Sequence, residues 1–166
     1  MIDKLNIVVI GSGMYSVGRG TKGFGTIMPA IYEWQRDGGL VEKVVFVSTS
    51  GKSSDIVLNK SKKLKARSGI ELKIEAYPEK GEDSYNEYKK IISSIPRPAC
   101  AIICVPDHLH FQVAKDCLNE NLPVLMVKPL TPTSSEGREL VNLAKEKNVY
   151  AIIEFHKRLD KSNIMM

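Results

Sequence analysis

The sequence LNIVVIGSG, residues 5–13, joins an apolar run to a glycine-containing turn. The run from Leu5 to Ile10 has the near-continuous apolar character of a strand that is buried on both faces of a parallel sheet. Gly11 and Gly13 follow it directly, and glycines there allow a tight turn and let backbone N–H groups approach phosphate oxygens. The sequence therefore predicts a first strand and a pyrophosphate-binding turn that includes Met14. A glycine-rich surface loop without a ligand is the alternative interpretation.

The glycines after this strand depart from the G-x-G-x-x-G fingerprint of dinucleotide-binding proteins. Met14, Tyr15 and Ser16 follow the second glycine, so the third glycine is missing from its usual place. A literal G-x-G-x-x-G occurs only later, between residues 18 and 23. We interpret residues 15–25 as part of a flexible insertion that makes the loop about ten residues longer than the fingerprint implies. We therefore expect no helix before residue 26.

Strand and helix patterns alternate along the rest of the chain, which is typical of β-α-β units and a parallel sheet. The predicted strands are residues 5–10, 43–48, 72–76, 99–105, 124–127 and 149–154. The predicted helices are residues 26–36, 53–67, 84–95, 111–119 and 134–147. Ser53, Ser84 and Ser134 are suited to cap three helix starts, and Gly69 is suited to end the basic helix before it. The predicted fold class is α/β: a doubly wound, mainly parallel Rossmann sheet of about six strands with helices on both faces.

The composition excludes several classes of protein. At 166 residues, with 43% hydrophobic and 26% charged residues, the chain has the size and balance of one soluble globular domain. No stretch approaches the roughly 18 apolar residues of a membrane span, and the N-terminus lacks a signal-peptide layout. We therefore expect a cytoplasmic protein with no membrane partner.

The cysteines and the basic residues point to ordinary structural roles. Cys100, Cys104 and Cys117 are odd in number and lie in apolar or helical contexts, so we expect reduced thiols instead of disulfides. The net charge of +5 comes largely from the predicted helix that contains residues 60–67, where aromatic residues are not interleaved with the lysines. This pattern favours a solvated helix face over a nucleic-acid site.

Small hydroxyl residues and a cation follow the second predicted strand. Ser48, Ser50 and Lys52 occupy the place where a carboxylate normally binds the adenosine ribose of NAD. Hydroxyls and a lysine can instead bind a 2′-phosphate through hydrogen bonds and charge. The pattern therefore favours NADP as the cofactor, with NAD as the alternative; an ordinary serine-rich turn is the plainer interpretation.

Three motifs later in the chain resemble the Gfo/Idh/MocA oxidoreductases, a family named for glucose–fructose oxidoreductase and inositol dehydrogenase. The motifs are AIICVPDHLH at residues 101–110, VLMVKPL at residues 124–130 and EFHKRL at residues 154–159. The resemblance implies that a segment with Val105, Pro106, His108 and His110 lies along the cofactor. It also implies that Lys128 and Pro129 lie at the nicotinamide end, with Lys128 as the catalytic residue.

The chain differs from the family pattern at two places. Val127 stands where the family usually has a glutamate before the Lys-Pro pair, which changes the electrostatic setting of Lys128. The insertion after Gly13 is the second difference. His108 and His110 form an H-x-H pair with no obvious third ligand, so we expect no metal site.

The residues and the resemblance together predict an NAD(P)-dependent oxidoreductase that transfers a hydride between a nicotinamide cofactor and a sugar- or polyol-like substrate. Residues 1–158 would form the dinucleotide-binding Rossmann domain. Residues 159–166 would begin the connection to a C-terminal substrate domain that is absent from this chain. We expect a fragment that is inactive alone and homo-oligomeric when full length, with a stand-alone cofactor module as the alternative. The alternative function is a non-catalytic dinucleotide-binding sensor or regulatory module.

Overall fold

The computed structural model describes residues 4–165, except for the side chains of His156 and Leu159. Within these residues one sheet has the strand order β3-β2-β1-β4-β5-β6, and every neighbouring pair is parallel. The strands are β1 (Leu5–Ile10), β2 (Val41–Val47), β3 (Ile74–Tyr77), β4 (Ala99–Ile103), β5 (Val124–Val127) and β6 (Ala151–Glu154). The predicted α/β fold with a doubly wound parallel sheet is confirmed.

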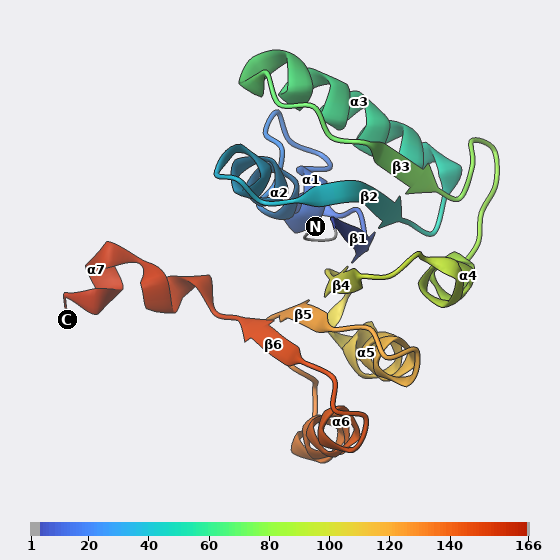
Figure 1. The fold of residues 1–166 in the computed structure, drawn as a ribbon, viewed down its shortest axis with the longest axis vertical. Coiled ribbons are helices and arrows are strands. Elements are labelled where there is room, and N and C mark those ends of the chain that lie inside the picture. The colour runs from blue at the N-terminus through green and yellow to red at the C-terminus, as the bar shows by residue number, and fades with distance from the viewer. Residues whose placement is uncertain (1–3, 166) are drawn as a thin grey trace.

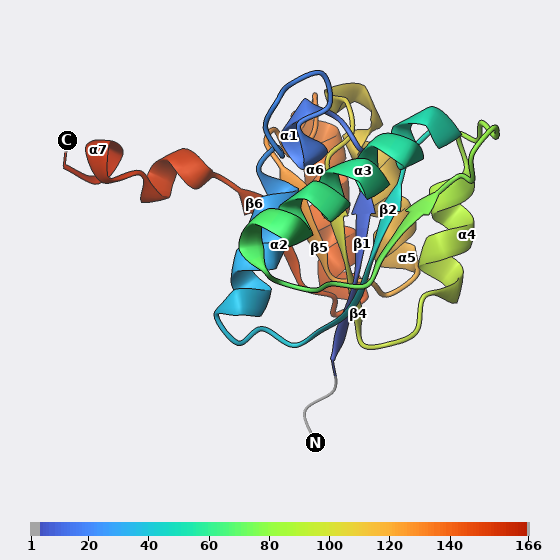
Figure 2. The ribbon, with the colours of Figure 1, turned by 90° about the horizontal axis from the view of Figure 1, so that it is seen from above.

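Helices cover both faces of the sheet, as Figures 1 and 2 show. The first face is covered by α1 (Met14–Val17), α2 (Ile27–Arg36) and α3 (Gly51–Ser68). The second face is covered by α4 (Glu87–Ser94), α5 (His110–Asn119) and α6 (Ser134–Glu146). Two 3₁₀ turns, Asp107–Leu109 and His156–Leu159, and the short α7 (Lys161–Ile164) complete the elements. The segment after β6, which includes α7, runs away from the sheet in both views.

Successive side chains of β1 pack into the hydrophobic cores on opposite faces of the sheet. Ile7 and Val9 of β1 pack with α2 and α3, whereas Val8 and Ile10 pack with α4 and α5, and all four are at most 3% exposed. A strand that is buried on both faces needs apolar side chains on both, which explains the near-continuous apolar runs in the sequence.

The first helix begins earlier than predicted. α1 starts at Met14, directly after Gly13, so the expectation of no helix before residue 26 is wrong. α2 then begins at Ile27, close to the predicted start. The inserted residues therefore lie between two helical segments, at residues 18–26, and do not separate the glycine turn from its helix.

All three N-caps differ from the predicted serines, whereas the predicted C-terminal stop is confirmed. Asn86 stands at the N-cap position of α4 in place of Ser84. Ser50 caps α3 by accepting a hydrogen bond from the backbone N–H of Ser53 at 3.4 Å. Thr133 caps α6 in place of Ser134. Gly69 ends α3 in the left-handed region with φ 72°. Neighbouring hydroxyl residues can each serve as a cap, so the sequence alone does not select between them.

The three cysteines are free thiols: Cys100 lies in β4, Cys104 directly follows β4, and Cys117 lies in α5. Cys117 is buried, and Cys100 and Cys104 are partly buried. Burial raises the pKa of Cys100 to about 11 and is the main cause that raises the pKa of Cys104 and of Cys117 to about 12. The reactive thiolate form is therefore scarce at neutral pH. Across residues 4–165, no helix combines the length and the apolar character that a membrane span requires.

Candidate functional site

The strand order reverses between β1 and β4, at the centre of the sheet. The connection after β1 leads to one face and the connection after β4 leads to the other. Such a reversal leaves a crevice beyond the carboxyl ends of the strands, where open α/β sheets bind their ligands. A cavity of about 720 Å³ opens there, between the turn after β1, the ends of β2 and β4, and parts of α1, α4 and α5. This volume lies in the range of roughly 300–1,000 Å³ that is typical of ligand pockets.

The two glycines of the turn after β1 meet different surroundings. Gly11 has φ +102°, and a Cβ atom on it would lie 2.2 Å from the carbonyl oxygen of Cys104. A Cβ atom on Gly13 would have no atom within 4 Å, although Gly13 lines the cavity. Gly11 is thus required for the close approach of the turn to β4, and Gly13 leaves open space in which a ligand can approach the backbone. Met14, at 67% exposure, lines the cavity next to them.

Buried serine hydroxyls line the same turn. Ser16 stands at the place of the missing third glycine and is fully buried, and its Oγ has no hydrogen-bond partner in the part of the chain that is described. Ser48, at the end of β2, donates to Ser12 Oγ at 2.6 Å and so ties β2 to the turn. A hydroxyl without a partner beside an open glycine suits a ligand that offers hydrogen-bond acceptors, such as a pyrophosphate.

The cavity wall at the end of β2 carries hydroxyls and a guanidinium group. Ser48, Thr49 and Ser53 line it together with Arg19, which donates from Nη1 to Ser53 Oγ at 3.0 Å. Ser50 and Lys52, which the sequence pointed to, are not among the lining residues. The Ser50 side chain instead caps α3, and Lys52 is exposed. Arg19 gives no signal in the sequence, because it belongs to the insertion and meets Ser53 of α3 only in the fold.

The residues after β4 divide between the cavity and the core. Val105 and Pro106 line the cavity. His108 is exposed, and His110 is fully buried; neither lines the cavity. The Nδ1 atom of His110 lies 2.6 Å from the carbonyl oxygen of Pro129, and its Nε2 atom lies 3.0 Å from that of Val105. His110 therefore links the loop after β4 to the loop after β5. No group of three or more potential metal ligands occurs within residues 4–165.

Lys128 and Pro129 follow β5 at the same edge of the sheet, outside the lining of the cavity. Lys128 is exposed. Val127, which replaces the family glutamate, is the register partner of Glu154 on β6. Register partners in a parallel sheet point to the same face and are about 4.8 Å apart. A carboxylate is thus present on this face, one strand farther out than the family pattern has it.

Glu154 connects the outermost strand to the turn after β1. Its Oε2 atom accepts a hydrogen bond of 2.9 Å from the hydroxyl of Tyr15, a residue of α1 that lines the cavity. Burial, followed by this bond and the Glu154 charge, raises the pKa of Tyr15 to about 12. The same charge adds to burial in raising the pKa of Cys104 to about 12. The 139 positions between Tyr15 and Glu154 explain why the sequence does not reveal this pair.

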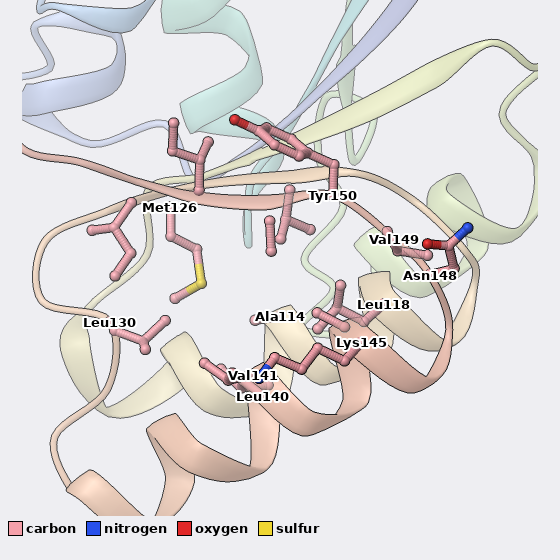
Figure 3. Close-up of a pocket in the computed structure, with 15 residues that line it drawn as sticks. Ala114, Leu118, Met126, Leu130, Leu140, Val141, Lys145, Asn148, Val149 and Tyr150 are labelled. Carbon is pink, nitrogen blue, oxygen red and sulfur yellow. The ribbon is translucent and has the colours of Figure 1, made fainter.

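A second cavity, of about 500 Å³, lies between α6 and the sheet. Figure 3 shows Met126, Leu130 and Leu140 among the apolar side chains around it. Most of its lining is apolar, and none of the predicted site residues belongs to it. Ligand sites usually combine an apolar lining with a few convergent polar groups, which the cavity beside the glycine turn offers. The candidate site is therefore the cavity between β1 and β4.

Comparison with known proteins points to redox chemistry. The family model described as an oxidoreductase family with an NAD-binding Rossmann fold matches residues 5–155. An uncharacterised oxidoreductase of Schizosaccharomyces pombe is 39% identical over 59 residues, which are 36% of this chain and 16% of that protein. The scyllo-inositol 2-dehydrogenase (NADP(+)) of Bacillus subtilis is 32% identical over 69 residues, which are 42% of this chain and 19% of that protein.

A solved structure has a fold similar to that of this chain. The crystal structure of biliverdin reductase from Synechocystis, in complex with biliverdin and NADP+, superposes with a TM-score of 0.61 at 19% identity. The superposition covers 93% of this chain and 38% of that one. The matched segments cover 16%, 19% and 38% of these three similar proteins, so the chain spans less than half of their length.

Proposed function

The chain belongs to this oxidoreductase family, and from that premise we propose that it is the NADP(H)-binding part of an enzyme acting on a sugar- or polyol-like substrate. The observation that carries the proposal is the cavity at the strand-order reversal, where the open Gly13 and the unpartnered hydroxyl of Ser16 line one space. The bound cofactor would supply hydride transfer, and the chain would supply positioning.

The proposed roles follow the position of each residue along the cavity. Gly11, Gly13 and Met14 form the turn that would hold the pyrophosphate through backbone N–H groups. Val105 and Pro106, which line the cavity beside this turn, would lie along the cofactor. The proposal assigns the end of β2 to the adenosine.

A preference for NADP over NAD is supported by the chemistry at the end of β2. The cavity there is lined by Ser48, Thr49, Ser53 and Arg19, and no carboxylate of the described residues lines it to bind a ribose diol. The relative in Bacillus subtilis is named as an NADP(+) enzyme, and the biliverdin reductase was crystallised with NADP+. Fluorescence titration tests the preference: we expect NADPH to bind the chain more tightly than NADH, and the reverse order would contradict it.

Lys128 is the proposed catalytic residue, which would polarise or orient the substrate oxygen from the carboxyl edge of the sheet. In a full-length protein that contains this chain, we expect Lys128→Ala to lower kcat/KM by about 10²-fold or more while cofactor affinity changes little. Lys128→Met, which keeps the length of the side chain, should be equally impaired. Near-normal steady-state kinetics in both folded variants would contradict the assignment.

A non-catalytic sensor is the second candidate, and Val127 is the observation that favours it. The family glutamate beside the Lys-Pro pair is absent, so the electrostatic support of a reacting lysine differs here. A full-length protein that binds NADPH but oxidises or reduces none of a panel of sugars and polyols would support the sensor. Cofactor turnover with any of them would exclude it.

A further inference from the structure

The inserted loop at residues 18–26 is closed by its own backbone. The N–H of Thr26 donates to the carbonyl oxygen of Tyr15 at 2.6 Å, and the N–H of Thr21 donates to that of Gly18 at 3.0 Å. Gly25 has φ +74°, and a Cβ atom on it would lie 2.6 Å from the Tyr15 carbonyl oxygen. The chain thus leaves α1 and returns to it within a tightly packed loop.

The loop is also held against α3. Lys60, on α3, donates from Nζ to the carbonyl oxygen of Thr21 at 2.8 Å and to that of Gly23. The same ammonium group lies 5.7 Å from the centre of the Phe24 ring. These contacts fix the loop against the middle of α3.

Arg19 extends from this loop to the cavity. Its Nη1 atom donates to Ser53 Oγ at 3.0 Å, and Ser53 Oγ lies 3.1 Å from Ser50 Oγ. Within residues 4–165, Arg19 forms no ion pair with a carboxylate. A guanidinium group has five N–H donors, so most of them are available to a ligand. Arg19 is therefore an oriented cation whose charge is not neutralised by a neighbouring acid.

We propose that Arg19 binds the 2′-phosphate of NADP(H) and sets the preference for it over NAD(H). This inference rests on the proposed function, because it assigns a ligand group to the same cavity. A guanidinium group matches a phosphate bidentately and forms charge-assisted hydrogen bonds with it. Ser48, Thr49 and Ser53 surround the same end of the cavity with further hydroxyl groups. Lys52, the cation that the sequence suggested, does not line this wall.

Titration of NADPH and NADH into the 166-residue chain distinguishes the contribution of Arg19 to the cofactor preference from that of Lys52. We expect Arg19→Ala to weaken NADPH binding by about tenfold or more, since one charge-assisted hydrogen-bond pair is lost, and to change NADH binding by less than about twofold. Lys52→Ala should leave the ratio of the two affinities near that of the wild type. An unchanged ratio in Arg19→Ala, or an equal loss in Lys52→Ala, would overturn the inference.

Two further measurements make the result independent of folding and of the nicotinamide. Arg19→Gln keeps a donor for Ser53 but removes the charge, so it should lose NADPH affinity with an unchanged circular dichroism spectrum. In both Arg19 variants, 2′,5′-ADP should displace bound NADH less effectively than in the wild type, whereas 5′-AMP should displace NADH as effectively as in the wild type. If the wild type binds NADH and 5′-AMP but shows no advantage for the 2′-phosphate, Arg19 is wrongly assigned and the preference for NADP fails, while the proposal that the cavity binds a dinucleotide stands. If the wild type binds no dinucleotide, both fail.

Discussion

Gly11 and Gly13 are two residues apart, yet substitution of Gly11 should lower stability, whereas substitution of Gly13 should lower cofactor affinity. Gly11→Ala would force a side chain into φ +102° and against the carbonyl oxygen of Cys104, so we expect it to lower the free energy of unfolding by at least about 1–2 kcal/mol. Gly13→Ala meets no atom and has φ −78°, so stability should hold. Its methyl group would enter the cavity, and we expect cofactor affinity to fall by about tenfold or more.

Urea denaturation and NADPH titration of the two variants check this pair of expectations. The interpretation of the turn would be wrong if Gly11→Ala were as stable as the wild type, or if Gly13→Ala bound cofactor normally.

Tyr15 gives a pH-dependent signal from the candidate site. Its pKa is raised from 10.0 to about 12, mainly by burial and then by Glu154. Because the folded-state value is above the unfolded one, the corresponding contribution to stability is complete below pH 10 and is lost as the pH rises through about 12. Ultraviolet titration of the phenol, as the difference between wild type and Tyr15→Phe, should show this late ionisation.

Glu154→Gln is the matched variant for that titration, since an amide oxygen can still accept from the Tyr15 hydroxyl but carries no charge. We expect the Tyr15 pKa to move toward its ordinary value. An unchanged midpoint would mean that the charge of Glu154 does not raise the pKa of Tyr15.

At the scale of elements, His110 at the start of α5 joins the loops that follow β4 and β5. The ring is fully buried, with Val105 and Pro129 carbonyl oxygens at 3.0 and 2.6 Å. His110→Ala would leave a cavity and at least one buried carbonyl without its partner, so we expect the free energy of unfolding to fall by about 2–5 kcal/mol. His108→Ala, at an exposed position, should change it by less than about 0.5 kcal/mol.

Urea denaturation of the two histidine variants provides the measurement. Equal stability of His110→Ala and His108→Ala would show that the buried ring does not hold the two loops.

The elements themselves could be predicted well from the sequence, because burial on both faces leaves near-continuous apolar strands. The start of α1 could not, since the glycines at 18, 20, 23 and 25 suggested an uninterrupted loop after residue 13. One helical turn forms there because Val17 is fully buried against the first face of the sheet. The burial of Val17 thus outweighed the preference for a loop that the nearby glycines indicate.

At the scale of the whole molecule, the cavity brings together residues from distant parts of the chain. Gly11 and Gly13 were recognisable in advance because they follow the first strand, and Val105 and Pro106 because their segment resembles a family motif. The contact of Arg19 with Ser53 spans 34 positions, and that of Tyr15 with Glu154 spans 139. Contacts between positions so far apart depend on strand order and loop path, which one sequence does not reveal.

The central claim is that a dinucleotide binds between β1 and β4, and amide chemical-shift mapping of the ¹⁵N-labelled chain with NADP+ tests it most directly. Residues 11–16, 48–49 and 104–105 line the candidate cavity, whereas residues 148–153 line the apolar cavity beside α6. We expect saturable shifts in the first group and little change in the second. Shifts confined to residues 148–153, or no shifts at millimolar NADP+, would contradict the claim.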